Sequence, residues 1–221
     1  MCSQDDNPGP PSKSLIDLVL RTAGVALDTD LPAVSARMPS APFWPDYWPG
    51  EHYRLLAAFV RVLAPRIVIE IGTHTGLSAL SLKRYLPDNA VLYTFDVVPW
   101  KQIPGTCLRD EDFHDGRLKQ IVADLSQPDG FNEHRDKIAS APLMFIDGPK
   151  DKLFEPAFLS NLRRLTFSKP AYLVFDDIKD WNMLGVWRGI EAPKLDITSF
   201  GHWTGTGIVE WGTVTSATTG K

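Results

Sequence analysis

The sequence predicts an α/β fold in which a mostly parallel sheet is covered by helices on both faces. Short runs of β-branched and aromatic residues alternate with segments of helical spacing, a pattern typical of parallel strands joined by helices. Five such runs contain or end in acidic residues: 66–72, 91–96, 118–124, 143–147 and 171–177. Two final runs at 195–200 and 207–211 are joined by a short glycine-containing link, which predicts an antiparallel hairpin and therefore a mixed sheet.

The helical segments follow in a regular order. A helix at 14–21 precedes a stretch at 40–50 whose prolines forbid a regular helix. Further helices are expected at 51–63, 78–85, 131–138, 155–165 and 181–190. The segment 97–116 is long and irregular, and loops of that length in small domains are often functional.

Length and composition allow one main domain with a sizeable core. A chain of 221 residues, of which 43% are hydrophobic and 23% charged, can form a single α/β unit. We expect a disordered tail at 1–13, N-terminal helices with an aromatic lid segment at 14–64, and the main domain at 65–215.

Charge and hydropathy limit the range of partners. A formal net charge of −4 gives no broad basic face, so nucleic acid is not expected as a partner. No apolar run approaches the ~20 residues that span a bilayer, and the N-terminus lacks the order of a secretory signal. Cys2 and Cys107 form neither a metal motif nor a disulfide framework. We expect a cytoplasmic protein without a membrane partner.

Acidic residues mark one edge of the predicted sheet. Ligands of open α/β sheets bind outside the carboxyl ends of the strands. The sequence therefore predicts a crevice surrounded by six carboxylates, those of Glu70, Asp96, Asp124, Asp147, Asp176 and Asp177.

The loop at 70–76 connects the first strand to a helix. Gly72 permits a sharp turn and Gly76 a close approach to the helix, whose N-terminus offers N–H groups. Hydroxyl groups come from Thr73, Thr75 and Ser78. A dinucleotide fingerprint would read G-x-G-x-x-G, whereas this loop reads G-x-x-x-G after Glu70. The negative charge of Glu70 disfavours pyrophosphate and favours a cationic or zwitterionic ligand. The alternative interpretation is that the loop is only a tight turn with a structural acid.

This series of motifs resembles the class I S-adenosylmethionine-dependent methyltransferases from about residue 51 to 211. The resemblance is carried by 69–76, 94–96, 123–125, 145–148 and 175–177. It implies a Rossmann-like, doubly wound, seven-stranded mixed sheet whose last strand is antiparallel, as the C-terminal hairpin suggests. The main domain at 65–215 would then be the S-adenosylmethionine-binding domain.

The resemblance also implies contacts with the cofactor. The loop residues Glu70, Gly72, Thr73, Thr75, Gly76 and Ser78 would lie under its methionine part. Asp96 would accept the two ribose hydroxyls, with Val97 beside the adenine. Asp124 and Leu125 would flank the adenine amine, and Asp147 would complete the binding site.

Within this superfamily, 147–151 followed by 175–177 is similar to the metal-dependent O-methyltransferases of the catechol and caffeoyl-coenzyme-A type and to related sugar O-methyltransferases of natural-product pathways. The similarity implies one divalent ion bound by Asp147, Asp176 and Asp177, although Asn is common at the last position. Oxygen ligands favour Mg²⁺, with Mn²⁺ or Ca²⁺ as alternatives. The other interpretation is that the acidic pair caps the next helix.

The predicted reaction is metal-assisted O-methylation of a phenolic, sugar or other natural-product hydroxyl. Coordination lowers the pKa of a hydroxyl, and Lys150 occupies the general-base position of the resembling enzymes, with Asp147 beside it; alternatively Lys150 pairs with Asp151 on the surface. Two other hypotheses stay open: a metal-independent small-molecule methyltransferase, and a non-catalytic protein that keeps the fold. Glycine spacing disfavours an NAD(P)-dependent reductase.

Two aromatic regions have several interpretations. The stretch around Trp44 to His52 could cover the substrate crevice, or could be a packed plug or a subunit contact. His202, in the link of the final hairpin, is either a second base or an inert turn residue. These exposed-looking segments also suggest a homodimer.

Overall fold

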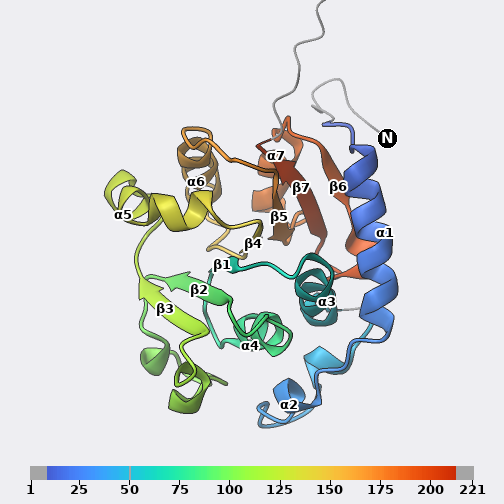
Figure 1. Ribbon diagram of the computed structural model, residues 1–221, viewed down its shortest axis with the longest axis vertical. Helices are drawn as coiled ribbons and strands as arrows, with labels where there is room; N and C mark the ends of the chain where they lie inside the picture. Colours follow the sequence, from blue (N-terminus) through green and yellow to red (C-terminus); the bar gives the residue numbers. More distant parts are fainter. Residues whose placement is uncertain (1–8, 50, 213–221) are drawn as a thin grey trace, which may run out of the picture.

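The computed structural model describes residues 9–49 and 51–212. One seven-stranded sheet has the order β3-β2-β1-β4-β5-β7-β6 (Figure 1). Its strands are β1 (Ile67–Ile71), β2 (Val91–Asp96), β3 (Leu118–Val122), β4 (Leu143–Ile146), β5 (Ala171–Asp176), β6 (Lys194–Asp196) and β7 (Thr206–Trp211). Strands β1 to β5 pair in parallel, and β7 pairs antiparallel with both β5 and β6. The predicted mixed α/β sheet is confirmed.

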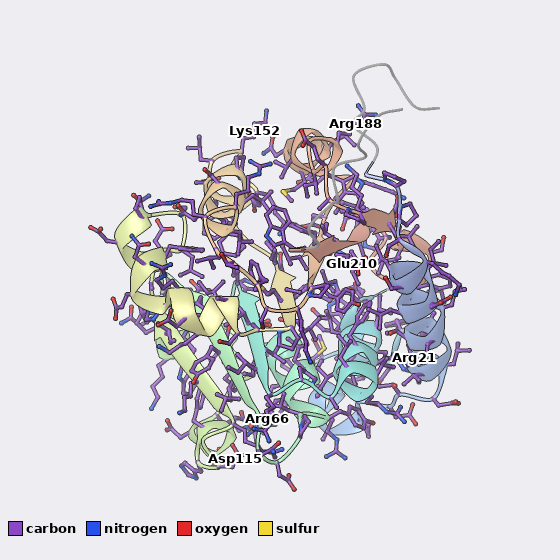
Figure 2. The ribbon with its side chains drawn as sticks, turned by 45° about the horizontal axis from the view of Figure 1, so that its top comes forward. Arg21, Arg66, Asp115, Lys152, Arg188 and Glu210 are labelled. Atoms are coloured by element: carbon purple, nitrogen blue, oxygen red, sulfur yellow. The ribbon has the colours of Figure 1, made fainter. Side chains whose placement is uncertain are left out.

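Helices cover both faces of the sheet. They are α1 (Lys13–Leu27), α2 (Pro32–Ser35), α3 (Tyr53–Leu63), α4 (Leu77–Arg84), α5 (Pro128–Ala139), α6 (Phe154–Leu162) and α7 (Trp181–Arg188). Helices α1, α3 and α4 pack on one face and α5, α6 and α7 on the other (Figure 1). Val68 and Ile69, adjacent on β1, belong to the two different cores because side chains alternate along a strand. Charged side chains such as Arg21, Arg66 and Asp115 lie around the outside (Figure 2).

The described helix and strand ends differ from the predictions at several places. Helix α5 begins three residues early, because Pro128 occupies its first turn, where a missing N–H costs nothing. The expected strand at 195–200 ends at Asp196, whose carboxylate accepts hydrogen bonds from the backbone N–H and the hydroxyl of Thr198. Such an Asp-led turn diverts the chain into a 3₁₀ helix, Thr198–Phe200.

The proline-rich and irregular segments contain only short 3₁₀ helices within their described parts. These are Trp44–Asp46 in the first, and Trp100–Gln102 and Asp110–Phe113 in the second. None of the described helices has the length and apolar character needed to cross a membrane.

Part of the expected N-terminal tail is attached to the sheet. The backbone N–H of Lys194 donates to the carbonyl of Gly9 at 3.2 Å, and Ser12 caps α1 by accepting from the N–H of Leu15 at 3.0 Å. Gly9 and Ser12 of the expected tail therefore contact the folded part of the chain. Residues 1–8 of that expected tail lie outside the described residues.

The turn after β1 is fixed against the end of β4. Gly72 has a φ of +94°, and a Cβ built there would lie 2.1 Å from the carbonyl oxygen of Asp147. The N–H of Asp147 also donates to the carbonyl of Ile71 at 2.9 Å. This glycine is therefore required by the packing of two strand ends, independently of any ligand.

We predict that Gly72→Ala destabilises the protein more than Gly116→Ala. Both glycines have positive φ values, but a Cβ at Gly116 would meet nothing within 4 Å. The control should cost about 1–2 kcal/mol for the left-handed backbone alone, and Gly72→Ala should cost more because of the clash. Urea unfolding measures both free energies, and equal losses would contradict this account of the turn.

Candidate functional site

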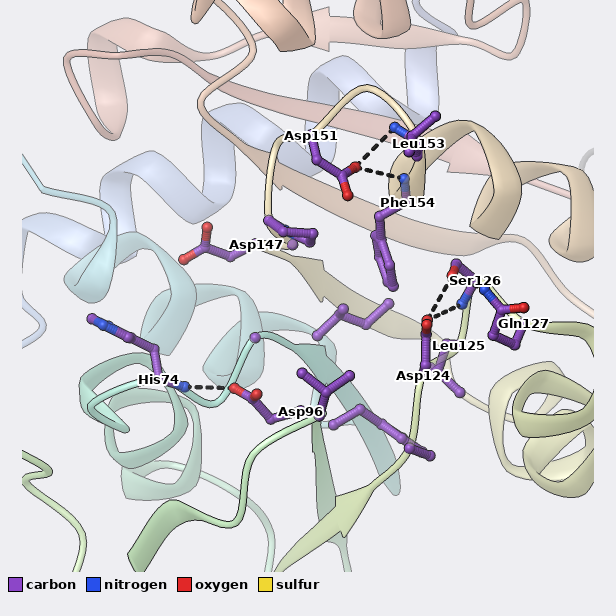
Figure 3. A pocket seen from close by; sticks show the side chains of 17 residues that line it. His74, Asp96, Asp124, Leu125, Ser126, Gln127, Asp147, Asp151, Leu153 and Phe154 are labelled. Carbon is purple, nitrogen blue, oxygen red and sulfur yellow. Dashed lines mark hydrogen bonds between the residues drawn. The ribbon is translucent and has the colours of Figure 1, made fainter. Parts of the chain in front are cut away.

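A cavity of about 630 Å³ lies beyond the carboxyl ends of β1, β2 and β4 (Figure 3). Its lining combines apolar side chains, among them Phe95, Leu125 and Phe154, with carboxylates. The acids are Asp96, Asp124, Asp147 and Asp151. None of the described residues that line it is Lys or Arg. Its volume suits a small-molecule ligand, and its charge favours a cation.

Asp96 is held at the edge of this cavity by the backbone. The N–H of His74 donates to Oδ2 at 3.1 Å, and the N–H of Val98 donates to Oδ1 at 3.0 Å (Figure 3). The neighbouring Val97 lines the cavity although it is 64% exposed. A fixed carboxylate beside an exposed apolar side chain can bind a hydroxylated ring and the face of a planar group.

Asp124 and Leu125 form another part of the wall. One carboxylate oxygen of Asp124 accepts hydrogen bonds from the N–H and the hydroxyl of Ser126, at 2.9 and 2.6 Å (Figure 3). Leu125 is buried in the core below α5 and α6. Gly72 and Asp147 also line the cavity, so the structure brings together six of the residues predicted to bind the cofactor.

The other predicted cofactor residues do not line this cavity. Thr73 is buried with its hydroxyl 2.7 Å from that of Thr94, and a Cβ on Gly76 would collide with Leu108. The carbonyl of Thr75 accepts from the N–H of Cys107 at 2.8 Å. Ser78 is buried in α4. As placed here, these residues brace the glycine loop.

Glu70 is buried within the sheet and faces away from the cavity. It is fully buried, and neither of its carboxylate oxygens makes a hydrogen bond. Its position alternates with Ile69 and Ile71, which belong to the core under α5 and α6. Burial raises the pKa of Glu70 to about 7. The carboxyl group is therefore protonated at mildly acidic pH and costly to ionise above it.

We predict that Glu70→Gln alters how stability depends on pH. The folded-state pKa lies above the ordinary 4.5, so the free energy of unfolding should fall as the pH rises from 4.5 through 7. The loss should reach about 3 kcal/mol at pH 8.5 and be absent in the variant. Chemical unfolding at several pH values measures it, with Glu133→Gln, an exposed acid, as the control. If the free energy of unfolding depended on pH in the same way in the wild type and in Glu70→Gln, the cost assigned to ionising the buried carboxyl group would be contradicted.

A charged cluster adjoins the cavity through Asp147. Lys150 contacts Oδ1 of Asp147, and its Nζ lies 3.3 Å from Oδ2 of Asp177. Burial alone would lower the pKa of Lys150, but Asp147 and Asp177 outweigh burial and raise that pKa. Lys150 is therefore an ammonium group at neutral pH, which opposes its predicted role as a base while both ion pairs persist.

Two histidines flank Asp176, the last residue of β5. Its Oδ1 lies 3.2 Å from Nδ1 of His202 and 3.5 Å from Nδ1 of His52. Burial alone would raise the pKa of Asp176, but the two imidazoles outweigh it and hold that pKa far below its ordinary range. Burial lowers the pKa of His202, but hydrogen bonds to Asp176 and Asp177 raise it to about 10.

The sequence did not predict this grouping. Glu51 and His52 immediately precede α3, and Nε2 of His202 lies 3.7 Å from Oε2 of Glu51. Among the described residues, two sets place their ligand atoms within 4.8 Å of one another: Asp176, Asp177 and His202, and Glu51, His52 and His202. Asp147 is in neither set, so the predicted three-carboxylate site is not assembled in this arrangement.

The sequence reasoning also missed part of the cavity wall. His74, to which the sequence assigns no role, lines the cavity, and its backbone N–H holds the carboxylate of Asp96. Leu153 and Phe154, at the start of α6, line it as well. Asp151 accepts hydrogen bonds from the N–H groups of these two residues (Figure 3). The sequence signal for this part of the wall was Asp151, an acid shortly before the apolar residues at the start of α6.

Solved structures share this architecture. A methyltransferase from Geobacter sulfurreducens matches with a TM-score of 0.56 and 16% identity, over 85% of this chain and 95% of that one. The chain has the class I methyltransferase fold. An O-methyltransferase from Bacillus cereus in complex with SAH matches at 0.55 and 18%, over 90% and 92%. A Staphylococcus aureus protein provisionally named a caffeoyl-CoA O-methyltransferase matches at 0.54 and 15%, over 90% and 98%. No protein-family model matches the sequence, and neither does any curated protein.

Proposed function

We propose that this protein is an S-adenosylmethionine-dependent O-methyltransferase that acts on a hydroxyl group of a small molecule. The charge of the cavity is the observation that carries the proposal. Four carboxylates and no described Lys or Arg line it, which favours a sulfonium cation and disfavours the pyrophosphate of a nicotinamide cofactor. The SAH complex of the B. cereus O-methyltransferase, which shares the fold, is consistent with this choice.

The residues that line the cavity fit the parts of this cofactor. Asp96 would accept hydrogen bonds from the ribose hydroxyls, because its carboxylate already faces the cavity edge. Val97 and Leu125 would contact the adenine, and Asp124 its amine. When bound, the cofactor supplies an electrophilic methyl group on a positively charged sulfur. Asp147, between the cavity and the charged cluster, would stand on the side where the acceptor enters.

Lys150 would hold the acceptor oxygen and stabilise its deprotonated form. Its ammonium group is fixed by Asp147, Asp177 and the carbonyl of Gly148, which lies 2.9 Å away. A positioned cation lowers the pKa of a hydroxyl beside it, and alignment of the oxygen with the methyl group can supply most of the remaining rate. The prediction of Lys150 as a general base stays untested.

The three carboxylates predicted to bind Mg²⁺ do not fit an all-oxygen site as they are placed. Lys150 neutralises Asp147 and Asp177, and the histidines flank Asp176. In this arrangement, Lys150 is the group that would stabilise the acceptor oxygen during the transfer. Chelation by EDTA distinguishes the two forms of the proposal, since unchanged turnover would favour the metal-independent methyltransferase.

We predict that Asp96→Ala weakens the binding of S-adenosylmethionine and SAH by about 5- to 150-fold. This is the range for losing about 1–3 kcal/mol of charge-assisted hydrogen bonds. Isothermal titration calorimetry measures the affinity, with Asp136→Ala, an exposed acid on α5, as the control. Wild-type protein that binds neither ligand would support the non-catalytic alternative, and preferential binding of NAD⁺ would overturn the cofactor assignment.

We predict that Lys150→Gln lowers turnover at least tenfold without changing the affinity for SAH, because the acceptor oxygen loses its positioned cation. Turnover is followed by SAH release and product mass with a panel of catechols, other phenols and sugars. Lys152→Gln is the matched control, since Lys152 is exposed and points out of the molecule (Figure 2). Equal turnover in both variants would remove Lys150 from the reaction.

A further inference from the structure

The backbone of Lys150 has an unusual conformation. Its φ is +54°, in the left-handed region that residues other than glycine seldom adopt. In this conformation the side chain reaches back over its own loop, so that the ammonium group lies 2.9 Å from the carbonyl of Gly148 and 3.3 Å from Oδ2 of Asp177. Such a strained residue persists only where the surrounding structure holds it.

The first turn of α6 holds the N–H of Lys150. This N–H donates to Oε1 of Glu155 at 3.3 Å. Glu155 is fully buried, and its Oε2 has no hydrogen-bond partner among the described residues. A Cβ on Gly148 would lie 2.8 Å from Oε1, so the carboxyl group lies directly against the loop. Asp151 already accepts from two N–H groups at the start of α6, and capping alone therefore does not explain a buried acid here.

The first turn of α7 holds the carbonyl of Lys150. Nδ2 of Asn182 donates to this oxygen at 2.8 Å. Helices α6 and α7 lie on the same face of the sheet (Figure 1), and each contributes one side chain to the same loop residue. The N–H and the carbonyl of Lys150 are thus both bound by side chains from distant parts of the sequence. Glu155 and Asn182 together form a clamp on this residue.

We propose that Glu155 and Asn182 are positioning residues for the methyl transfer. They hold the left-handed backbone of Lys150, which keeps its ammonium group between the two carboxylates that it contacts. The inference rests on the proposed O-methyl transfer, in which this ammonium stabilises the acceptor oxygen. Neither clamp residue is among the described residues that line the cofactor cavity, so each acts through Lys150. A released backbone would relax towards a more favourable φ and move the ammonium away from the acceptor.

Variants of nearly the same shape separate the clamp from simple packing. Burial raises the pKa of Glu155, so an uncharged side chain is suited to its site. Glu155→Gln keeps an oxygen that can accept from the N–H of Lys150, whereas Glu155→Ala removes it. Asn182→Asp replaces the donor with a carboxylate that repels the carbonyl of Lys150. An acid in the first turn of α7 is favoured by the helix N-terminus, so this variant should fold.

Turnover of the acceptor panel by the full-length protein tests the inference. We expect Asn182→Asp and Glu155→Ala to lower kcat by about fivefold or more with unchanged affinity for SAH, and Glu155→Gln to keep most of the wild-type kcat. Asn132→Asp, the same change at an exposed position of α5, is the matched control. In Lys150→Gln the change Asn182→Asp should have little further effect, because nothing is left to position. Losses that multiply would indicate a structural role and overturn the inference.

Chemical labelling reports on Lys150 without any acceptor. Brief treatment with acetic anhydride, followed by peptide mass spectrometry, compares Lys150, whose side chain is 12% exposed, with the exposed Lys152. We expect Lys150 to be protected in the wild type and in Glu155→Gln, and to lose protection in Asn182→Asp and Glu155→Ala. Equal protection in all variants would overturn the inference, as would wild-type kcat in the unprotected ones. Wild-type protein that methylates no acceptor would count against the proposed function, and the labelling would still decide whether the clamp holds Lys150.

Discussion

The concentration of carboxylates at one sheet edge is the constraint on which the site depends. Parallel pairing of β1, β4 and β5 aligns Ile71 with Ile146 and Ile146 with Phe175, so the acids that follow β4 and end β5 must lie side by side. Like charges at such separations repel strongly in a half-buried environment. The described structure offsets this repulsion with Lys150 on one side and two imidazoles on the other.

The sheet was predictable because its signal is local. Strands buried on both faces read as continuous apolar runs, and the acid after each run marks where β2, β4 and β5 end. Strand and helix ends that depend on side-chain hydrogen bonds are harder to predict from the sequence. The turn led by Asp196 ends a strand that was expected to reach Phe200, and α5 begins at Pro128 although its helical spacing is first evident at 131.

The direction of each side chain decides whether a residue predicted to bind the cofactor reaches the cavity. Asp96 is the last residue of β2 and reaches the cavity, whereas Glu70 precedes the last residue of β1 and points into the sheet face covered by α3 and α4. A shift of one residue reverses the face of a strand. The roles of Glu51, His52 and His202 depend on contacts between distant segments, which no local pattern encodes.

The two halves of the site are electrostatically one unit. Asp147 lines the cavity and also contacts Lys150, Lys150 reaches Asp177, and Asp177 faces His202. A cation entering the cavity would raise the free-energy cost of keeping Lys150 charged beside it. Binding of a cationic ligand in the cavity should therefore lower the proton affinity of Lys150. In such a state the lysine predicted as a base from the sequence, and found here as an ammonium, can exchange one role for the other.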